Sequence, residues 1–82
     1  MPSTEADYER VFNGISSKIA AKKKDYLPGD KLPTIAALAV EYVTSETTVK
    51  TALVLLRQAG WTIGRQGKGT FVAERPPIVA DS

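Results

Sequence analysis

The fold is decided by residues 45–72, SETTVKTALVLLRQAGWTIGRQGKGTFV, in which the spacing of the apolar residues changes part-way along. In the first half, apolar residues lie at the spacing of one face of an α-helix, at Val49, Ala52, Leu53 and Leu56. Ser45 before them is a favourable N-cap, and Gly60 after them is a favourable stop. The segment therefore predicts a helix over about residues 45–59.

The second half of this segment predicts a β-hairpin. From Trp61 the period becomes two, and β-branched and aromatic residues resume at residues 70–72 (TFV). Between the two runs, residues 67–69 (GKG) favour a tight turn, because glycine adopts the positive φ angles that such turns need. A hairpin directly after a helix forms the wing of a winged helix-turn-helix.

Two further helices are expected before this segment. From Asp7, apolar residues recur at helical spacing over residues 8–19, and Lys22–Lys24 at the expected end complement the helix dipole. Thr34 offers an N-cap for a short helix over about residues 35–42, with a brief strand at 31–32 before it. The predicted fold class is α+β, mainly α: a winged helix-turn-helix of three helices followed by a β-hairpin wing.

A chain of 82 residues holds one small domain, which we place at residues 7–75. Turn-forming and polar residues suggest a flexible N-terminus over residues 1–6, and a flexible C-terminus or the start of a linker over residues 76–82. The apolar runs are too short to cross a bilayer, and the N-terminus lacks a signal pattern, so we expect a soluble, cytoplasmic protein.

Composition excludes most kinds of chemistry and points to a polyanionic partner. The chain has no Cys and no His, so thiolate or imidazole metal sites and Cys- or His-dependent catalysis are excluded. We therefore expect no enzyme, no metal and no cofactor. Residues 10–75 hold all 11 Lys and Arg against 5 Asp and Glu, a balance of +6. Such a basic body suits nucleic acid, although a merely soluble surface would have the same balance.

The start of the helix at 45–59 is the expected base-reading element, as in other helix-turn-helix folds. A helical wheel points Thr47 and Thr51 away from the apolar stripe, with Lys50 beside them. Lys50 can donate to phosphate or guanine, and the threonines can bond to a base or contact a thymine methyl. Thr48 is an expected phosphate contact at the helix start. Glu46 is repelled by phosphate but accepts from cytosine, so it either specifies a C or turns aside.

The hairpin tip is the second expected contact, on phosphates or in a minor groove. Arg57, in contrast, is expected to lie too far along its helix to contact DNA. A Walker-type phosphate loop is excluded because a strand, not a helix, follows Gly69. The predicted DNA-binding set is Thr34, Ser45, Glu46, Thr47, Thr48, Lys50, Thr51, Arg65, Gln66, Gly67 and Lys68.

The residues from about Tyr8 to Ala73 resemble the N-terminal DNA-binding domain of the GntR family of bacterial transcription regulators. Three segments carry the resemblance: residues 28–34 (PGDKLPT), 47–50 (TTVK) and 65–72 (RQGKGTFV). The resemblance implies binding to double-stranded DNA at an inverted-repeat operator, usually as a homodimer, with repression as the expected role. It also implies a C-terminal effector-binding domain, which is absent from this chain.

The sequence departs from the family pattern at four positions. Ala36 and Glu46 stand where such domains usually hold a DNA-contacting arginine, and Val43 and Thr44 replace the usual glycine and valine of the turn. Losing two charged contacts predicts a flatter salt dependence, with binding supported by dimerisation or by Lys22–Lys24. The alternative function is a protein–protein interaction module, in which the two missing arginines and the exposed Val54 and Leu55 mark a partner surface.

Overall fold

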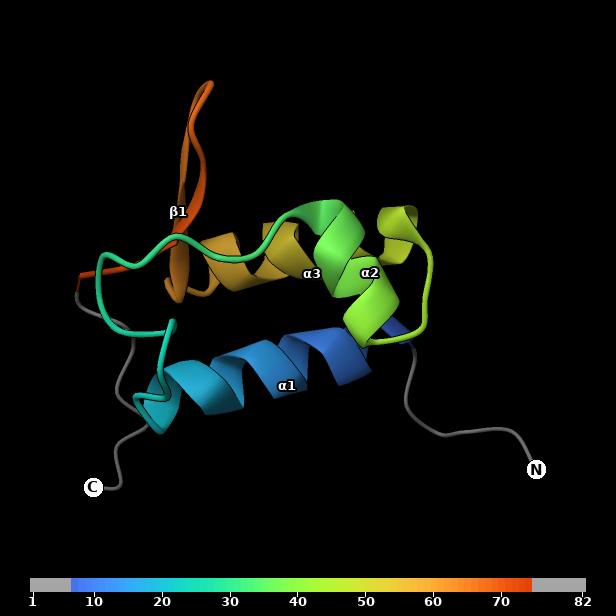
Figure 1. Ribbon diagram of the computed structural model, residues 1–82, viewed down its shortest axis with the longest axis horizontal. Coiled ribbons are helices and arrows are strands. Elements are labelled where there is room, and N and C mark those ends of the chain that lie inside the picture. Colours follow the sequence, from blue (N-terminus) through green and yellow to red (C-terminus); the bar gives the residue numbers. More distant parts are fainter. Residues whose placement is uncertain (1–6, 75–82) are drawn as a thin grey trace.

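Three helices and a β-hairpin follow one another in the predicted order, in a computed structural model that describes residues 7–74. The elements are α1 (Asp7–Ala20), α2 (Ile35–Glu41), α3 (Glu46–Gln58), β1 (Thr62–Arg65) and β2 (Gly69–Val72). The helices form the body of the fold, and the hairpin projects from it (Figure 1). The winged helix-turn-helix prediction is thereby confirmed. The ends predicted to be flexible, residues 1–6 and 76–82, lie outside the described residues.

The core consists of the apolar stripes that the helical spacing predicts. Helix α3 packs against α1, α2 and β1, so it lies at the centre of the fold. The fully buried side chains of the helices are Val11, Ile15, Leu38, Val49, Ala52 and Leu56. Burial of each larger aliphatic side chain stabilises the fold by roughly 1.5–3 kcal/mol. Tyr8, expected on the same stripe, is instead 37% exposed in the first turn of α1, where it lines an open groove.

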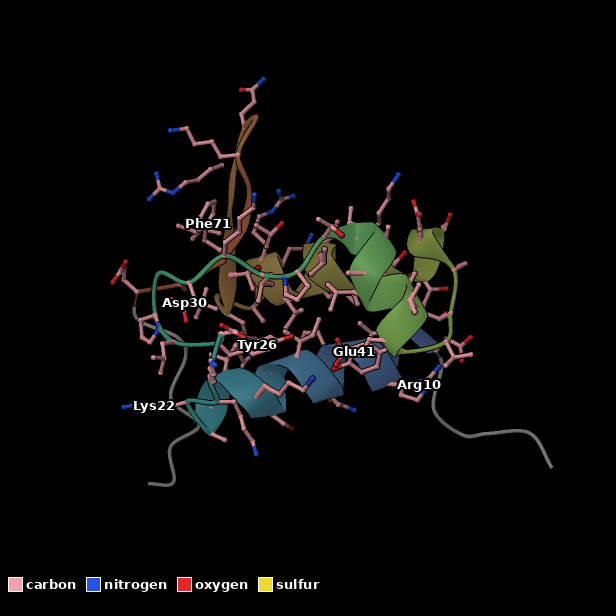
Figure 2. All side chains as sticks on the ribbon, in the orientation of Figure 1. Arg10, Lys22, Tyr26, Asp30, Glu41 and Phe71 are labelled. Carbon is pink, nitrogen blue, oxygen red and sulfur yellow. The ribbon has the colours of Figure 1, made fainter. Side chains whose placement is uncertain are left out.

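Helices α1 and α2 are joined by a close contact and two polar links. A Cβ atom at Gly14 would lie 2.8 Å from Cε1 of Tyr42, so the glycine in α1 is explained by this ring. Arg10 donates to the carbonyl of Tyr42 at 2.8 Å, and Lys18 pairs with Glu41 at 2.6 Å (Figure 2). The hydrogen bond that Lys18 donates to the carboxylate of Glu41 raises the pKa of Lys18 above its usual value.

The hairpin is held to the body at its base. Its strands pair antiparallel with Thr62 opposite Val72 and Arg65 opposite Gly69, and the first of these pairs is buried. The predicted brief strand is present as a bridge from Lys31 to Phe71, and the amide of Leu32 donates to the carbonyl of Thr70 at 2.8 Å. The segment before α2 therefore extends the sheet by one short edge.

All three helices end with the same hydrogen-bond pattern, the Schellman motif. In each, an amide donates to a carbonyl five residues earlier: Lys23 to Lys18, Thr44 to Ala39, and Trp61 to Leu56. The residue before each donor has a positive φ angle: 55° at Lys22, 53° at Val43 and 91° at Gly60. Only Gly60 adopts this conformation without steric cost, and the β-branched Val43 is the most strained of the three.

We expect Val43→Gly to raise the free energy of unfolding by about 1 kcal/mol, because glycine removes the left-handed strain. The change loses little packing, since Val43 is 86% exposed. Urea denaturation followed by the fluorescence of Trp61, the only tryptophan, measures the effect.

Val40→Gly is the matched control, because Val40 is 79% exposed but lies within α2 and has no positive φ angle. It should destabilise the fold by several tenths of a kcal/mol, as glycine does inside a helix. Equal losses from both substitutions would show that Val43 is not strained.

Candidate DNA-binding surface

The start of α3 is fixed by a side-chain cap. The hydroxyl of Ser45 accepts from the amide of Thr48 at 3.1 Å and donates to the hydroxyl of Thr48 at 3.0 Å. The Thr48 oxygen thus accepts internally, and its proton is left to donate outward. Because the first amides of a helix also point outward, Thr48 lies where an anion is bound most readily.

The exposed face of α3 carries two side chains without internal partners and a third side chain that makes one hydrogen bond to the helix backbone. Thr47 and Lys50 are exposed and make no side-chain hydrogen bond or ion pair within residues 7–74. Thr51 donates its hydroxyl proton to the carbonyl of Thr47 at 3.2 Å. Thr51 therefore presents an acceptor oxygen and a methyl group, which suit an amino group of a base or the thymine methyl.

Glu46 occupies the first position of α3 and is exposed. Its carboxylate has no hydrogen-bond or ion-pair partner among the described residues, so no internal partner draws it aside. A negative charge is favourable at this end of the helix dipole. Glu46 is thus stabilised by its own helix while its oxygens stay free to accept from outside.

The hairpin tip is a tight turn that carries two cations. The amide of Lys68 donates to the carbonyl of Arg65 at 2.9 Å, and Gly67 between them has a φ of 77°. The guanidinium of Arg65 lies 5.7 Å from the centre of the Phe71 ring, which holds it over one face of the hairpin. Lys31 crosses the same hairpin, and its Cε would lie 2.8 Å from a Cβ atom at Gly69.

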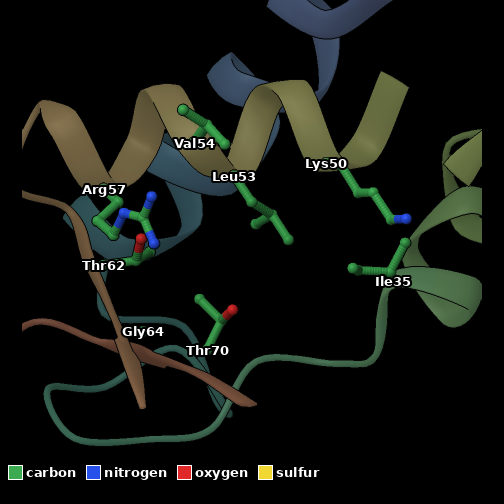
Figure 3. A pocket seen from close by; sticks show the side chains of 8 residues that line it. All are labelled: Ile35, Lys50, Leu53, Val54, Arg57, Thr62, Gly64 and Thr70. Carbon is green, nitrogen blue, oxygen red and sulfur yellow. The ribbon is translucent and has the colours of Figure 1, made fainter. Parts of the chain in front are cut away.

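Two adjoining hollows separate α3 from the hairpin, and Arg57 lines both. The first, of about 280 Å³, is lined by Ile35, Lys50, Leu53, Val54, Arg57, Thr62, Gly64 and Thr70 (Figure 3). The second is lined by Arg57, Gly64, Arg65, Gln66, Gly67, Lys68, Gly69 and Thr70. No Asp or Glu of the described chain lines either hollow, so the charged side chains that line them, Lys50, Arg57, Arg65 and Lys68, are all cations and favour an anion.

The predicted set falls into two groups around these hollows. Arg65, Gln66, Gly67 and Lys68 gather in the second hollow, and Lys50 lines the first. Residues 45–48 and Thr51 lie in the first turns of α3 and line neither. Thr34 caps α2 by accepting from the amide of Ala37 at 3.1 Å, next to Ile35 of the first hollow.

Two cations outside the predicted set lie beside it: Arg57 lines both hollows, and Lys31 lies against Gly69 of the hairpin. Arg57 follows Lys50 by seven residues, a spacing that places both on one helix face. The sequence therefore already indicated that Arg57 shares the face of Lys50. Lys31 gave no local signal, because only the pairing of the segment before α2 with β2 brings it to the hairpin. The predicted reliance on the lysine run gains no support, since Lys22 lies at the end of α1, away from the hairpin tip (Figure 2).

Val54 and Leu55, the apolar residues of the protein-interaction alternative, line different parts of the surface. Val54 lines the first hollow beside the hairpin, whereas Leu55 lines a separate groove with Tyr8 and Phe12 of α1. Within residues 7–74, no helix is long and apolar enough to cross a membrane, and no cluster of three side chains is suited to hold a metal ion.

Sequence comparison matches residues 7–72 to the family described as bacterial regulatory proteins, gntR family. The chain is 35% identical over 57 residues to YhcF, an uncharacterized HTH-type transcriptional regulator of Bacillus subtilis, covering 70% of this chain and 47% of YhcF. It is 39% identical over 67 residues to the histidine utilization repressor of Klebsiella aerogenes, covering 82% of this chain and 27% of the repressor. The chain thus spans less than half the length of these relatives.

Structural comparison finds the same fold in solved structures. The chain matches AraR(DBD) in complex with operator ORE1 with a TM-score of 0.79 and 33% identity, over 89% of each chain. It also matches the NTD of AraR in complex with mutant ORR3 with a TM-score of 0.78 and 33% identity, over 88% of this chain and 100% of that one. A GntR family transcriptional regulator from Listeria monocytogenes, 23% identical over 92% of this chain and 64% of its own, shares the fold with a TM-score of 0.79.

We expect Ser45→Ala to lower the free energy of unfolding by about 1 kcal/mol, because it removes the acceptor for the Thr48 amide. Ser45→Asp is the control, since a carboxylate oxygen caps a helix as well as a hydroxyl. Urea denaturation of both variants measures the difference. Equal stability of Ser45→Ala and the unsubstituted protein would rule out a stabilising cap at this residue.

Proposed function

The chain belongs to the GntR family of bacterial regulatory proteins, and from that membership we propose that it binds double-stranded DNA in a sequence-specific manner. The observation that carries the proposal is that the hairpin and the exposed face of α3 flank two hollows, whose lining contains Lys50, Arg57, Arg65 and Lys68 and no Asp or Glu from the described residues. The domain, residues 7–75, acts in the cytoplasm by binding and not by catalysis. The operator complexes of AraR, a protein of the same fold, support this proposal.

In the proposed complex, α3 lies in the major groove over about residues 45–59. Thr47, Lys50 and Thr51 meet base edges, and Glu46 accepts from a cytosine amino group. The capped pair Ser45 and Thr48 contacts phosphate through the outward hydroxyl of Thr48.

The wing and the second helix add contacts around this groove. The wing, about residues 65–69, contacts phosphates or the minor groove through Arg65, Gln66, Lys68 and the backbone of Gly67. Thr34, the N-cap residue of α2, contacts the sugar–phosphate backbone of the DNA.

We propose further that two copies bind an inverted repeat. A helix-turn-helix domain covers one half-site, and a two-fold pair of domains matches a two-fold operator. The match to a protein named as a repressor supports repression as the role of the full-length regulator.

Selection of duplexes from a random pool tests this function. The chain, tethered as a dimer, should enrich an inverted repeat whose half-site centres lie about 10 base pairs apart or a multiple of that. Absence of any enrichment at low salt would overturn the proposal.

Two lysines should differ in what they contribute. We expect Lys50→Ala to weaken binding to the selected duplex by about tenfold or more and to alter the preferred bases, since Lys50 meets base edges. Lys68→Ala should weaken binding equally on all sequences and lower the salt slope by about one. Fluorescence anisotropy over a salt series measures both. Lys22→Ala, away from the hairpin tip (Figure 2), is the control and should change neither quantity.

Glu46→Ala should remove the preference for one base pair in each half-site, because the carboxylate is the proposed acceptor for cytosine. Affinity for non-specific duplexes should rise, since one negative charge near phosphate is lost. Repeating the selection with this variant and with Glu46→Gln, which keeps an acceptor oxygen, gives the comparison. An unchanged consensus from Glu46→Ala would refute the role.

A further inference from the structure

Arg57 is an exposed cation with no internal partner. No hydrogen bond or ion pair joins its side chain to another residue in the described range 7–74. It lies in the last turn of α3, where a positive charge interacts favourably with the helix dipole. The interaction with the helix dipole requires only a positive charge near the end of α3, so it does not explain why the guanidinium lies between α3 and the hairpin.

The guanidinium lies between α3 and the hairpin, in the region that joins the two hollows. Its Nη1 would be 3.4 Å from a Cβ atom at Gly64, so the guanidinium lies against β1 at this residue. In Figure 3, Arg57 lies beside Thr62 and Gly64 at one end of the first hollow, and Lys50 lies at the other. The Thr62 hydroxyl in this wall is buried and has no partner within the described residues.

The position matters because, in the proposed complex, α3 lies in the major groove while the hairpin contacts the neighbouring phosphates or reaches the minor groove beyond them. The two grooves of a duplex are separated by a sugar–phosphate strand. When α3 occupies the major groove and the hairpin lies on the other side of that strand, the strand runs between them. Here the strand must cross the hollows that Arg57 lines. We infer that Arg57 holds a phosphate of the DNA strand that runs between α3 and the wing, an inference that rests on the proposed function.

The chemistry of the hollows suits a phosphodiester. Guanidinium binds phosphate oxygens through two parallel hydrogen bonds, which fixes orientation as well as charge. Arg57 lines both hollows and shares the second with Arg65 and Lys68, so the phosphate next to the one held by Arg57 also meets a cation. Thr70, half-buried in the same wall, offers a hydroxyl as a further donor.

Binding of a fluorescent mixed-sequence duplex over a series of salt concentrations tests this site, because a phosphate contact is independent of sequence. Arg57→Gln should weaken binding at low salt by about tenfold and lower the salt slope by about 0.9, the loss of one phosphate contact. Arg57→Lys should keep the slope and bind more weakly than the unsubstituted protein, because an ammonium lacks the paired donors.

Lys22→Gln is the control for net charge, since it removes one positive charge away from the hairpin tip and should leave the slope unchanged. The urea midpoint of each variant separates contact from folding: a purely structural Arg57 would lower the midpoint and leave the slope intact. If the unsubstituted protein binds and Arg57→Gln binds equally with the same slope, the Arg57 site is overturned and the proposed function stands. If the unsubstituted protein binds no duplex, both are overturned.

Discussion

The packing of α3 against the other two helices is the constraint on which the rest of the structure depends. Val49, Ala52 and Leu56 are fully buried, so the rotation of α3 about its own axis is fixed. That rotation decides which residues face outward, namely Thr47, Lys50 and Arg57. Ala52 has a second effect, because a small buried residue lets α3 lie close to its neighbours. The surface that meets a partner is therefore set by the residues that never touch it.

The position of the wing depends on the same helix. The end of α3 passes directly into β1 through Gly60, and the amide of Trp61 donates back to Leu56. Thr62 and Val72 then bury the base of the hairpin, and the segment at residues 29–32 pairs along its other edge. The hairpin is thus held from both sides, so the gap that Arg57 lines has a defined width and does not depend on a flexible loop.

The sequence predicted those features that depend on local spacing. The three helices, the caps at Thr34 and Ser45, and the hairpin turn arise from residues close together in the chain, and the structure contains all of them. The position of Lys31 beside the hairpin was not predictable, because it arises from pairing between distant segments. The left-handed conformation of Val43 is disfavoured for valine itself, and its only signal was the family resemblance, in which a glycine usually stands at this position. The side-chain roles in DNA recognition remain predictions.

The left-handed residue at Val43 has a consequence for how such a domain changes over generations. Its side chain contributes almost no burial, so the strain is not compensated by packing. Substitutions that alter the exposed start of α3 tend to reduce stability, and a domain near its stability threshold tolerates few of them. A chain that gains glycine at this corner can accept more such substitutions before it unfolds. The corner between the two helices therefore governs how readily new binding preferences can arise, although it reads no base itself.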